Sequence, residues 1–149
     1  MYKHIMLATD GSEASDQAEK ECMAFAKSIG AKVTAIYVIS HFHLHYQPWA
    51  TPKSVHTQIE KEHEQEAMEI ARKMISKLEA RAKVAGVKCD GEVVVGDHPY
   101  EEIVGNAEKR KCDLTMMASH GRMGLGAILL GSETVKVLTH TRIPVLVVR

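Results

Sequence analysis

Segments with the sequence pattern of β-strands alternate with segments that have the pattern of α-helices along this chain. Short apolar runs rich in β-branched residues predict strands, and runs with apolar residues at helical spacing predict helices. The expected strands are residues 2–9, 32–39, 87–95, 113–118 and 143–148. The expected helices are residues 14–29, 54–85, 99–109 and 133–138. This alternation is typical of a parallel sheet whose strands are joined by crossover helices.

The long second helix differs from the others in its pattern. One of its faces is expected to carry the apolar residues Ala67, Ile70, Ala71, Met74, Ile75 and Leu78. Gly86 follows as its stop signal. Its first half is mostly polar, and together with the histidine-rich loop before it this half is a candidate partner surface.

Right-handed crossovers restrict such a chain to a doubly wound α/β sheet with helices on both faces. The chain has 149 residues, of which 45% are hydrophobic and 26% are charged, so it is about one domain long and can bury a sizeable core. It has no linker long enough to divide it. We therefore expect residues 1–149 to form a single domain.

The charge balance and the cysteines limit the classes of partner and compartment. Nineteen basic residues offset nineteen acidic ones, so the net charge gives no reason to expect nucleic acid or an anionic membrane as a partner. Three widely spaced cysteines, Cys22, Cys89 and Cys112, favour a reducing compartment over a disulfide framework. The sequence shows neither a signal-peptide pattern nor a run of roughly 20 apolar residues. We therefore expect a cytoplasmic protein.

A glycine-containing motif follows the fourth expected strand. The segment Ala118-Ser119-His120-Gly121 is separated by nine residues from Gly131-Ser132, which comes just before a helix. A glycine lets a ligand approach the backbone closely, and the first turn of a helix presents unpaired N–H groups at the positive end of the helix dipole. Both features suit a phosphate group.

This motif resembles that of the universal stress protein family, whose nucleotide-binding members carry Gly-x-x-Gly, nine residues, and then Gly-Ser or Gly-Thr. The resemblance covers the whole chain, because residues 5–12 look like the family's first strand and acidic turn, residues 96–99 like its third crossover, and residues 144–148 like its last strand. One position departs from the pattern, since Ala118 stands where the family has its first glycine. An alanine is strained there if φ is positive and fits if φ is negative.

The resemblance implies the strand order 3-2-1-4-5 and an adenine nucleotide, ATP or AMP, as the ligand. Sheets of this kind bind ligands outside the carboxyl ends of the strands at the switch point, here between the first and fourth strands. That placement brings Asp10 next to the glycine motif. The nucleotide-binding residues are then expected to be Ala8, Thr9, Asp10, Val38, Met117, Ala118, His120, Gly121, Arg122, Gly131, Ser132 and Glu133.

Several of these assignments have a structural alternative. Asp10 can accept a hydrogen bond from a ribose hydroxyl or help to hold Mg²⁺, but it can also cap the following helix. Val38 matches the family position whose backbone reads the adenine edge, and is otherwise a core residue. Met117 and Ala118 either line the adenosine pocket or form a buried strand end.

The residues of the phosphate loop are open to two interpretations as well. Gly121, Gly131 and Ser132 would present N–H groups and a hydroxyl to the phosphates, or they form an ordinary turn and cap. His120 is expected to be a structural or phosphate-side donor rather than a general base. Arg122 either meets a terminal phosphate or is a solvated loop residue.

Three histidines alternate in the loop after the second strand. An extended backbone would point His41, His43 and His45 the same way, as a metal site could use. No cysteine or carboxylate lies at ligand spacing, so solvated histidines are the competing interpretation.

The expected function follows from these sites. The chain has no G-x-x-x-x-G-K-[ST] motif and no evident water-positioning residue, so we expect no catalysis beyond slow ATP hydrolysis. We expect a nucleotide-binding stress-response sensor or regulatory module. The alternatives are a nucleotide-free dimeric interaction scaffold of the same fold and a metal-binding module that uses the histidine-rich loop. The apolar strand from Ile143 to Val148 would lie at the sheet edge, and the family's usual pairing through this strand implies a homodimer.

Overall fold

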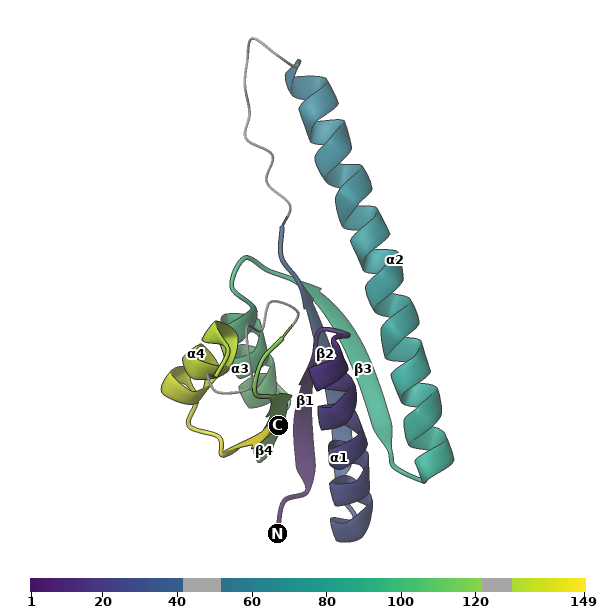
Figure 1. The fold of residues 1–149 in the computed structure, drawn as a ribbon, viewed down its shortest axis with the longest axis vertical. Coiled ribbons are helices and arrows are strands. Elements are labelled where there is room, and N and C mark those ends of the chain that lie inside the picture. The colour runs from purple at the N-terminus through teal and green to yellow at the C-terminus, as the bar shows by residue number, and fades with distance from the viewer. Residues whose placement is uncertain (42–51, 122–129) are drawn as a thin grey trace.

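The computed structural model describes residues 1–41, 52–121 and 130–149. In this part of the chain the elements are, in order, β1 (His4–Thr9), α1 (Glu13–Ile29), β2 (Lys32–Ile39), α2 (Lys53–Ala85), β3 (Cys89–Val95), α3 (Pro99–Lys109), β4 (Leu114–Ala118), α4 (Ser132–His140) and β5 (Val145–Val148). The strands form one parallel sheet in the order β3-β2-β1-β4-β5 (Figure 1). The expected α/β class and strand order are confirmed.

Helices cover both faces of this sheet. Side chains of α1 and α2 pack against one set of strand residues, in a core that includes Leu7 and Leu78. Side chains of α3 and α4 pack against the alternate strand residues, in a second core that includes Met6 and Ile103. Because successive strand residues point to opposite faces, Met6 and Leu7 belong to different cores. A sheet buried on both faces explains why the strands read as continuous apolar runs.

Local signals account for the ends of the helices. The Ser12 hydroxyl accepts a hydrogen bond of 3.2 Å from the Ser15 N–H and caps α1. Gly30 ends α1 and Gly86 ends α2, each in the left-handed conformation that glycine adopts without a steric penalty. Pro99 stands at the first position of α3, where its missing N–H is not needed.

The C-terminal elements differ from the expected bounds. β5 begins at Val145, two residues later than expected. Pro144 has no N–H to offer a ladder, and the Ile143 N–H instead donates to the Thr141 hydroxyl over 3.1 Å. α4 continues to His140, past the expected end at residue 138. β1, β3 and β4 also begin one or two residues later than expected.

The long helix α2 packs through its second half. Its buried residues are Ala71, Ile75, Leu78 and Ala82. The first half projects beyond the sheet (Figure 1). The expectation that Ile70 lies on the packed face is wrong, because this side chain is exposed. Ala67 lies at one border of the packed surface of α2. Ile70 lies beyond that border, on the side of Ala67 that is turned away from the buried residues.

None of the helices among the described residues is both long enough and apolar enough to span a membrane.

Candidate functional site

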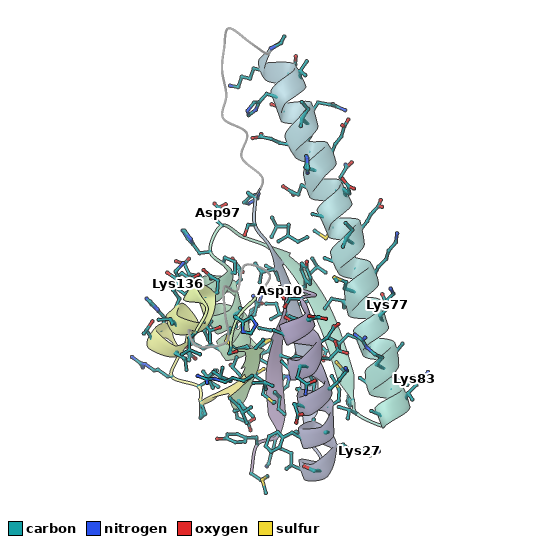
Figure 2. All side chains as sticks on the ribbon, in the orientation of Figure 1. Asp10, Lys27, Lys77, Lys83, Asp97 and Lys136 are labelled. Carbon is teal, nitrogen blue, oxygen red and sulfur yellow. The ribbon has the colours of Figure 1, made fainter. Side chains whose placement is uncertain are left out.

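The carboxyl ends of β1 and β4 lie side by side in the sheet, and the residues that follow them meet. The two strands are hydrogen-bonded neighbours. A Cβ atom at Gly121 would lie 2.5 Å from Oδ2 of Asp10, so only a glycine lets the backbone come so close to this carboxylate. Figure 2 shows Asp10 where β1 ends and α1 begins. The structure therefore brings Asp10 and the glycine motif together, as expected.

One oxygen of Asp10 organises the turn that leads into α1. Oδ1 accepts hydrogen bonds from the Ser12 N–H at 3.0 Å and from the Ser15 hydroxyl at 2.5 Å. The Asp10 N–H donates in turn to the Ser15 hydroxyl oxygen at 3.2 Å. The helix cap itself is Ser12 and not Asp10. Asp10 thus fixes the turn through Oδ1, while Oδ2 is the oxygen that faces Gly121.

The second half of the motif is held against the end of β4. The Gly131 N–H donates a hydrogen bond of 2.7 Å to the Ser119 carbonyl. A Cβ atom at Gly131 would lie 3.2 Å from the His120 Cα, which is tighter than ordinary contact. The Ser119 N–H donates to the Val148 carbonyl at 2.7 Å, which ties this turn to the end of β5. Residues 119–121 therefore lie between Asp10 on one side and the start of α4 on the other.

The N-terminus of α4 lies at this junction. Gly131 is its N-cap and has no side chain, and within the described residues no side chain caps the first turn. The first N–H groups of a helix have no intrahelical acceptor and carry its positive dipole end. The buried Thr134 hydroxyl donates to the Ala118 carbonyl over 3.1 Å and holds α4 in place. The arrangement suits an anion bound by the backbone of residues 131–134.

The expected adenosine-pocket residues divide between the two faces of the sheet. Ala8, Met117 and the half-buried Val38 belong to the core under α3 and α4. Ala118 belongs to the opposite core, under α1 and α2. Thr9 is half-buried, and its hydroxyl accepts a 3.4 Å hydrogen bond from the Gly11 N–H in the turn before α1. Ala8, Met117 and Val38 thus lie on one face of the sheet, and Ala118 lies on the other.

The backbone at Ala118 carries no strain. This residue is the last of β4, where it pairs with Val148, and Lys111 is the only described non-glycine residue with a positive φ. An alanine is therefore accommodated at the position where the family pattern has glycine.

Two of the expected phosphate-side residues have partners within the protein. The Glu133 carboxylate accepts hydrogen bonds from the Tyr100 N–H at 3.0 Å and from the Lys136 ammonium at 2.8 Å, so it joins α3 to α4. The hydrogen bond with Glu133 raises the pKa of Lys136. His120 is half-buried, with its Nδ1 3.0 Å from the Ser119 hydroxyl. Ser132, by contrast, is exposed at the start of α4.

The histidine-rich loop is described only at its start. His41 Nδ1 lies 3.4 Å from Oε2 of Glu64 on α2. His43 and His45 lie outside the described residues, as does Arg122 of the phosphate loop. Among the residues that the structure does describe, no three histidine, cysteine or acidic side chains are placed to hold a metal ion.

Three buried hydroxyl residues at the site were not predicted from the sequence. Ser15 bonds to Asp10, Ser119 contacts His120, and Thr134 bonds to the end of β4. Ser15 and Thr134 each follow a glycine or a cap residue by three or four positions, whereas Ser119 comes two residues before Gly121. A hydroxyl residue in the first turn of a helix next to a glycine motif is the signal that could have identified Ser15 and Thr134.

Comparisons with known proteins agree with this architecture. The profile of the universal stress protein family matches residues 1–149. Universal stress protein MJ0531 of Methanocaldococcus jannaschii is 38% identical over 149 residues, which cover 100% of this chain and 83% of the relative. The solved structure of MJ0577 from the same organism superposes with a TM-score of 0.84 at 33% identity, over 99% of this chain and 96% of that one.

A more distant structure shares the fold. The universal stress protein of Archaeoglobus fulgidus in complex with dAMP has a TM-score of 0.65 and 16% identity, over 99% of this chain and 98% of its own. The match over all 149 residues, the identity to MJ0531 and the strand order lead to one conclusion. The chain belongs to the universal stress protein family.

Proposed function

We propose that this protein binds an adenine nucleotide, ATP or AMP, at the carboxyl ends of β1 and β4. The observation that carries the proposal is the close approach of Gly121 to Asp10 next to the N-terminus of α4, which no described side chain caps. Two loops that are distant in the sequence meet there, with an acidic group on one side and the first N–H groups of a helix on the other. A relative with this fold has been solved with dAMP, which is an adenine nucleotide.

In this proposal different residues of the site bind different parts of the nucleotide. The phosphates lie over the first turn of α4, where Gly131 and Ser132 present N–H groups and a hydroxyl. The adenosine lies toward the face that carries Ala8, Val38 and Met117. Asp10 accepts a ribose hydroxyl or holds Mg²⁺ through Oδ2. Magnesium commonly binds one or two carboxylates together with substrate phosphates, which one aspartate beside a phosphate site would satisfy.

We further propose that nucleotide occupancy, rather than turnover, is the output of the protein. Rapid phosphoryl transfer needs a placed nucleophile and strong charge stabilisation. The lysine of the described site, Lys136, is engaged by Glu133. A sensor or regulatory module in a stress response fits such a site better than an enzyme does. Slow ATP hydrolysis is the most catalytic activity that we propose for it.

We also propose a homodimer that pairs through β5. This strand is an edge of the described sheet, and Leu146 on it is 38% exposed. An open edge offers unpaired backbone groups, and pairing with a second copy would cover them together with the apolar side chain. A monomeric mass in solution at micromolar concentration would contradict this assembly.

The test of binding is a calorimetric titration of the purified protein with ATP and Mg²⁺, after extraction and identification of any nucleotide that co-purifies. We expect micromolar binding that is lost in Gly131→Val, because the branched side chain would press on the His120 backbone. Thr139→Val, on the exposed end of α4, is the matched control and should bind normally. No carried nucleotide and no binding in the wild-type protein would favour the nucleotide-free scaffold.

A further inference from the structure

The helix α2 carries an apolar stripe that faces away from the protein. Its exposed large apolar side chains are Val55, Ile59, Ile70 and Val84, which are between 37% and 90% exposed. They are spaced by four, eleven and fourteen residues. At about 100° of rotation per residue these spacings place all four within about 60° of one another on the helix surface.

The stripe lies on the side of α2 opposite to its packed side. The buried residues Ala71, Ile75, Leu78 and Ala82 are centred about 140° around the helix from the stripe. In Figure 2 the Lys77 side chain extends from the side of α2 turned away from the sheet. The stripe is therefore not an extension of the core.

Charged residues complete the same stripe in an unfavourable order. Glu62 and Glu66 are four residues apart, and so are Lys73 and Lys77. Like charges at this spacing repel one another on a helix surface. Glu66 and Lys73 are two turns apart, about 10.5 Å, which is too far for an ion pair within one helix. In the described part of the chain no hydrogen bond or ion pair engages Glu66, Lys73 or Lys77.

An antiparallel copy of the same helix would remove both repulsions. We place the two-fold axis between residues 69 and 70. The numbers of any two residues that face each other across the interface then add up to 139. The facing pairs are then Val55 with Val84, Glu62 with Lys77 and Glu66 with Lys73 of the second copy. Glu62 and Glu66 each meet a lysine, and the apolar ends meet each other. Ile70 lies beside the axis, opposite Glu69 of the second copy. A two-fold interface of this kind is self-complementary by construction.

We propose that the outer face of α2, from Val55 to Val84, docks antiparallel on the same face of a second copy of this chain. The stripe runs for about 44 Å, because 29 residues rise by 1.5 Å each. This interface is separate from the edge strand β5. A protein that pairs through both surfaces assembles beyond a dimer, into a tetramer or a longer chain of dimers.

The first experiment is a charge exchange followed by light scattering and analytical ultracentrifugation over a range of micromolar concentrations. Glu66→Lys and Lys73→Glu each set like charges against each other across the interface. Each should weaken the association by about tenfold, since two symmetry-related ion pairs become repulsive. Arg72→Glu makes the same charge change as Lys73→Glu at an exposed position outside the stripe, and it should associate as the wild type does.

The exchange also tests the register. The double variant E66K/K73E restores opposite charges and should associate again. An equimolar mixture of the two single variants should also associate, because each supplies the charge that the other needs. Circular dichroism checks that every variant is folded. The proposal is wrong if the wild-type assembly has no larger mass than those of the single variants, or if the double variant fails to regain the wild-type mass. If this face binds a partner of another kind, the wild-type protein and the single variants should have the same mass.

A cysteine test reports the direction of the pair independently. Ile70→Cys lies beside the two-fold axis and should form a disulfide between copies under mild oxidation. Val55→Cys alone should not cross-link, whereas V55C/V84C should. Cross-linking of Val55→Cys alone would indicate a parallel pair and would overturn the proposal. Each variant is compared with the wild-type protein, whose Cys89 is half-buried and whose other cysteines are buried.

Discussion

Replacing Gly121 with alanine tests the contact on which the proposed site depends. The added Cβ would lie 2.5 Å from Oδ2 of Asp10, whereas a carbon and an oxygen normally approach to about 3.3 Å. The backbone itself does not oppose the change. Gly121 is not among the described glycines with positive φ, so alanine fits its dihedral angles. The whole cost therefore comes from the contact with the carboxylate.

Two movements can relieve this contact, and their costs can be compared. Turning the Asp10 carboxylate away breaks its hydrogen bonds to Ser12 and Ser15, and each bond to a charged group contributes about 1.5–3 kcal/mol. Shifting the loop at Gly121 instead costs about 1–3 kcal/mol, as overpacking usually does. The loop shift is the cheaper movement. Alanine regains about 0.4–1 kcal/mol by restricting the unfolded chain. We therefore expect a net loss of about 1–2 kcal/mol of stability.

A double-mutant cycle with Asp10→Ala isolates the contact. In the Asp10→Ala background the methyl group meets no carboxylate, so Gly121→Ala should cost less than about 0.5 kcal/mol. Urea unfolding followed by circular dichroism measures all four proteins, and ATP titration should show at least about tenfold weaker binding by Gly121→Ala. An equal cost of Gly121→Ala in both backgrounds would refute the reasoning, since it would mean that the two loops do not touch.

Three further predictions concern buried polar groups. Thr134→Val removes the hydroxyl that bonds to the Ala118 carbonyl and should lower the stability by about 1–3 kcal/mol in urea unfolding, whereas an unchanged midpoint would exclude that bond. Burial lowers the pKa of His4 in the folded protein. Below about pH 6.5 the unfolded chain therefore binds a proton at His4 more readily than the folded protein does, and the free energy of unfolding should fall as the pH drops further. His4→Gln should flatten this slope, and a slope as steep as that of the wild type would assign it to other groups. Arg81→Met leaves the buried Glu19 carboxyl without its 2.7 Å ion pair and should cost about 1–3 kcal/mol at pH 7, less than a fully buried pair because Arg81 is half exposed. Burial already raises the pKa of Glu19, so this cost should shrink at acidic pH as Glu19 takes up a proton, and a cost independent of pH would contradict the pairing.

Elements with strong local signals were predicted with their observed bounds. β2 covers Lys32–Ile39 and α3 covers Pro99–Lys109, as expected from the sequence. The first is a run of β-branched residues that follows a glycine stop, and the second begins at a proline. β5 begins later than expected because the Ile143 N–H donates its hydrogen bond to the Thr141 hydroxyl, and a pattern of apolar residues does not predict this bond. Strand ends depend on such hydrogen bonds, and hydropathy does not report them.

The sequence likewise predicted only some features of the candidate site. The meeting of Asp10 with Gly121 followed from the strand order that the family resemblance implied, and it is confirmed. The roles of the residues in nucleotide binding stay predictions. The partners of Glu133 were not foreseen, since Tyr100 lies 33 residues away in the sequence and meets it only because α3 packs on α4.

The sequence by itself determined the alternation of strands and helices, the glycine stops of the helices, and the two glycine segments, because each of these depends on neighbours along the chain. The sequence also predicted most of the packed side of α2, since Ala71, Ile75 and Leu78 are buried as expected. Only the tertiary structure decided that Ile70 is exposed and that Glu133 joins two helices. The physical reason is that helical spacing groups residues over a wide arc of the helix surface. How much of that arc is buried depends on the position of the sheet, and that position is set by contacts between residues far apart in the sequence.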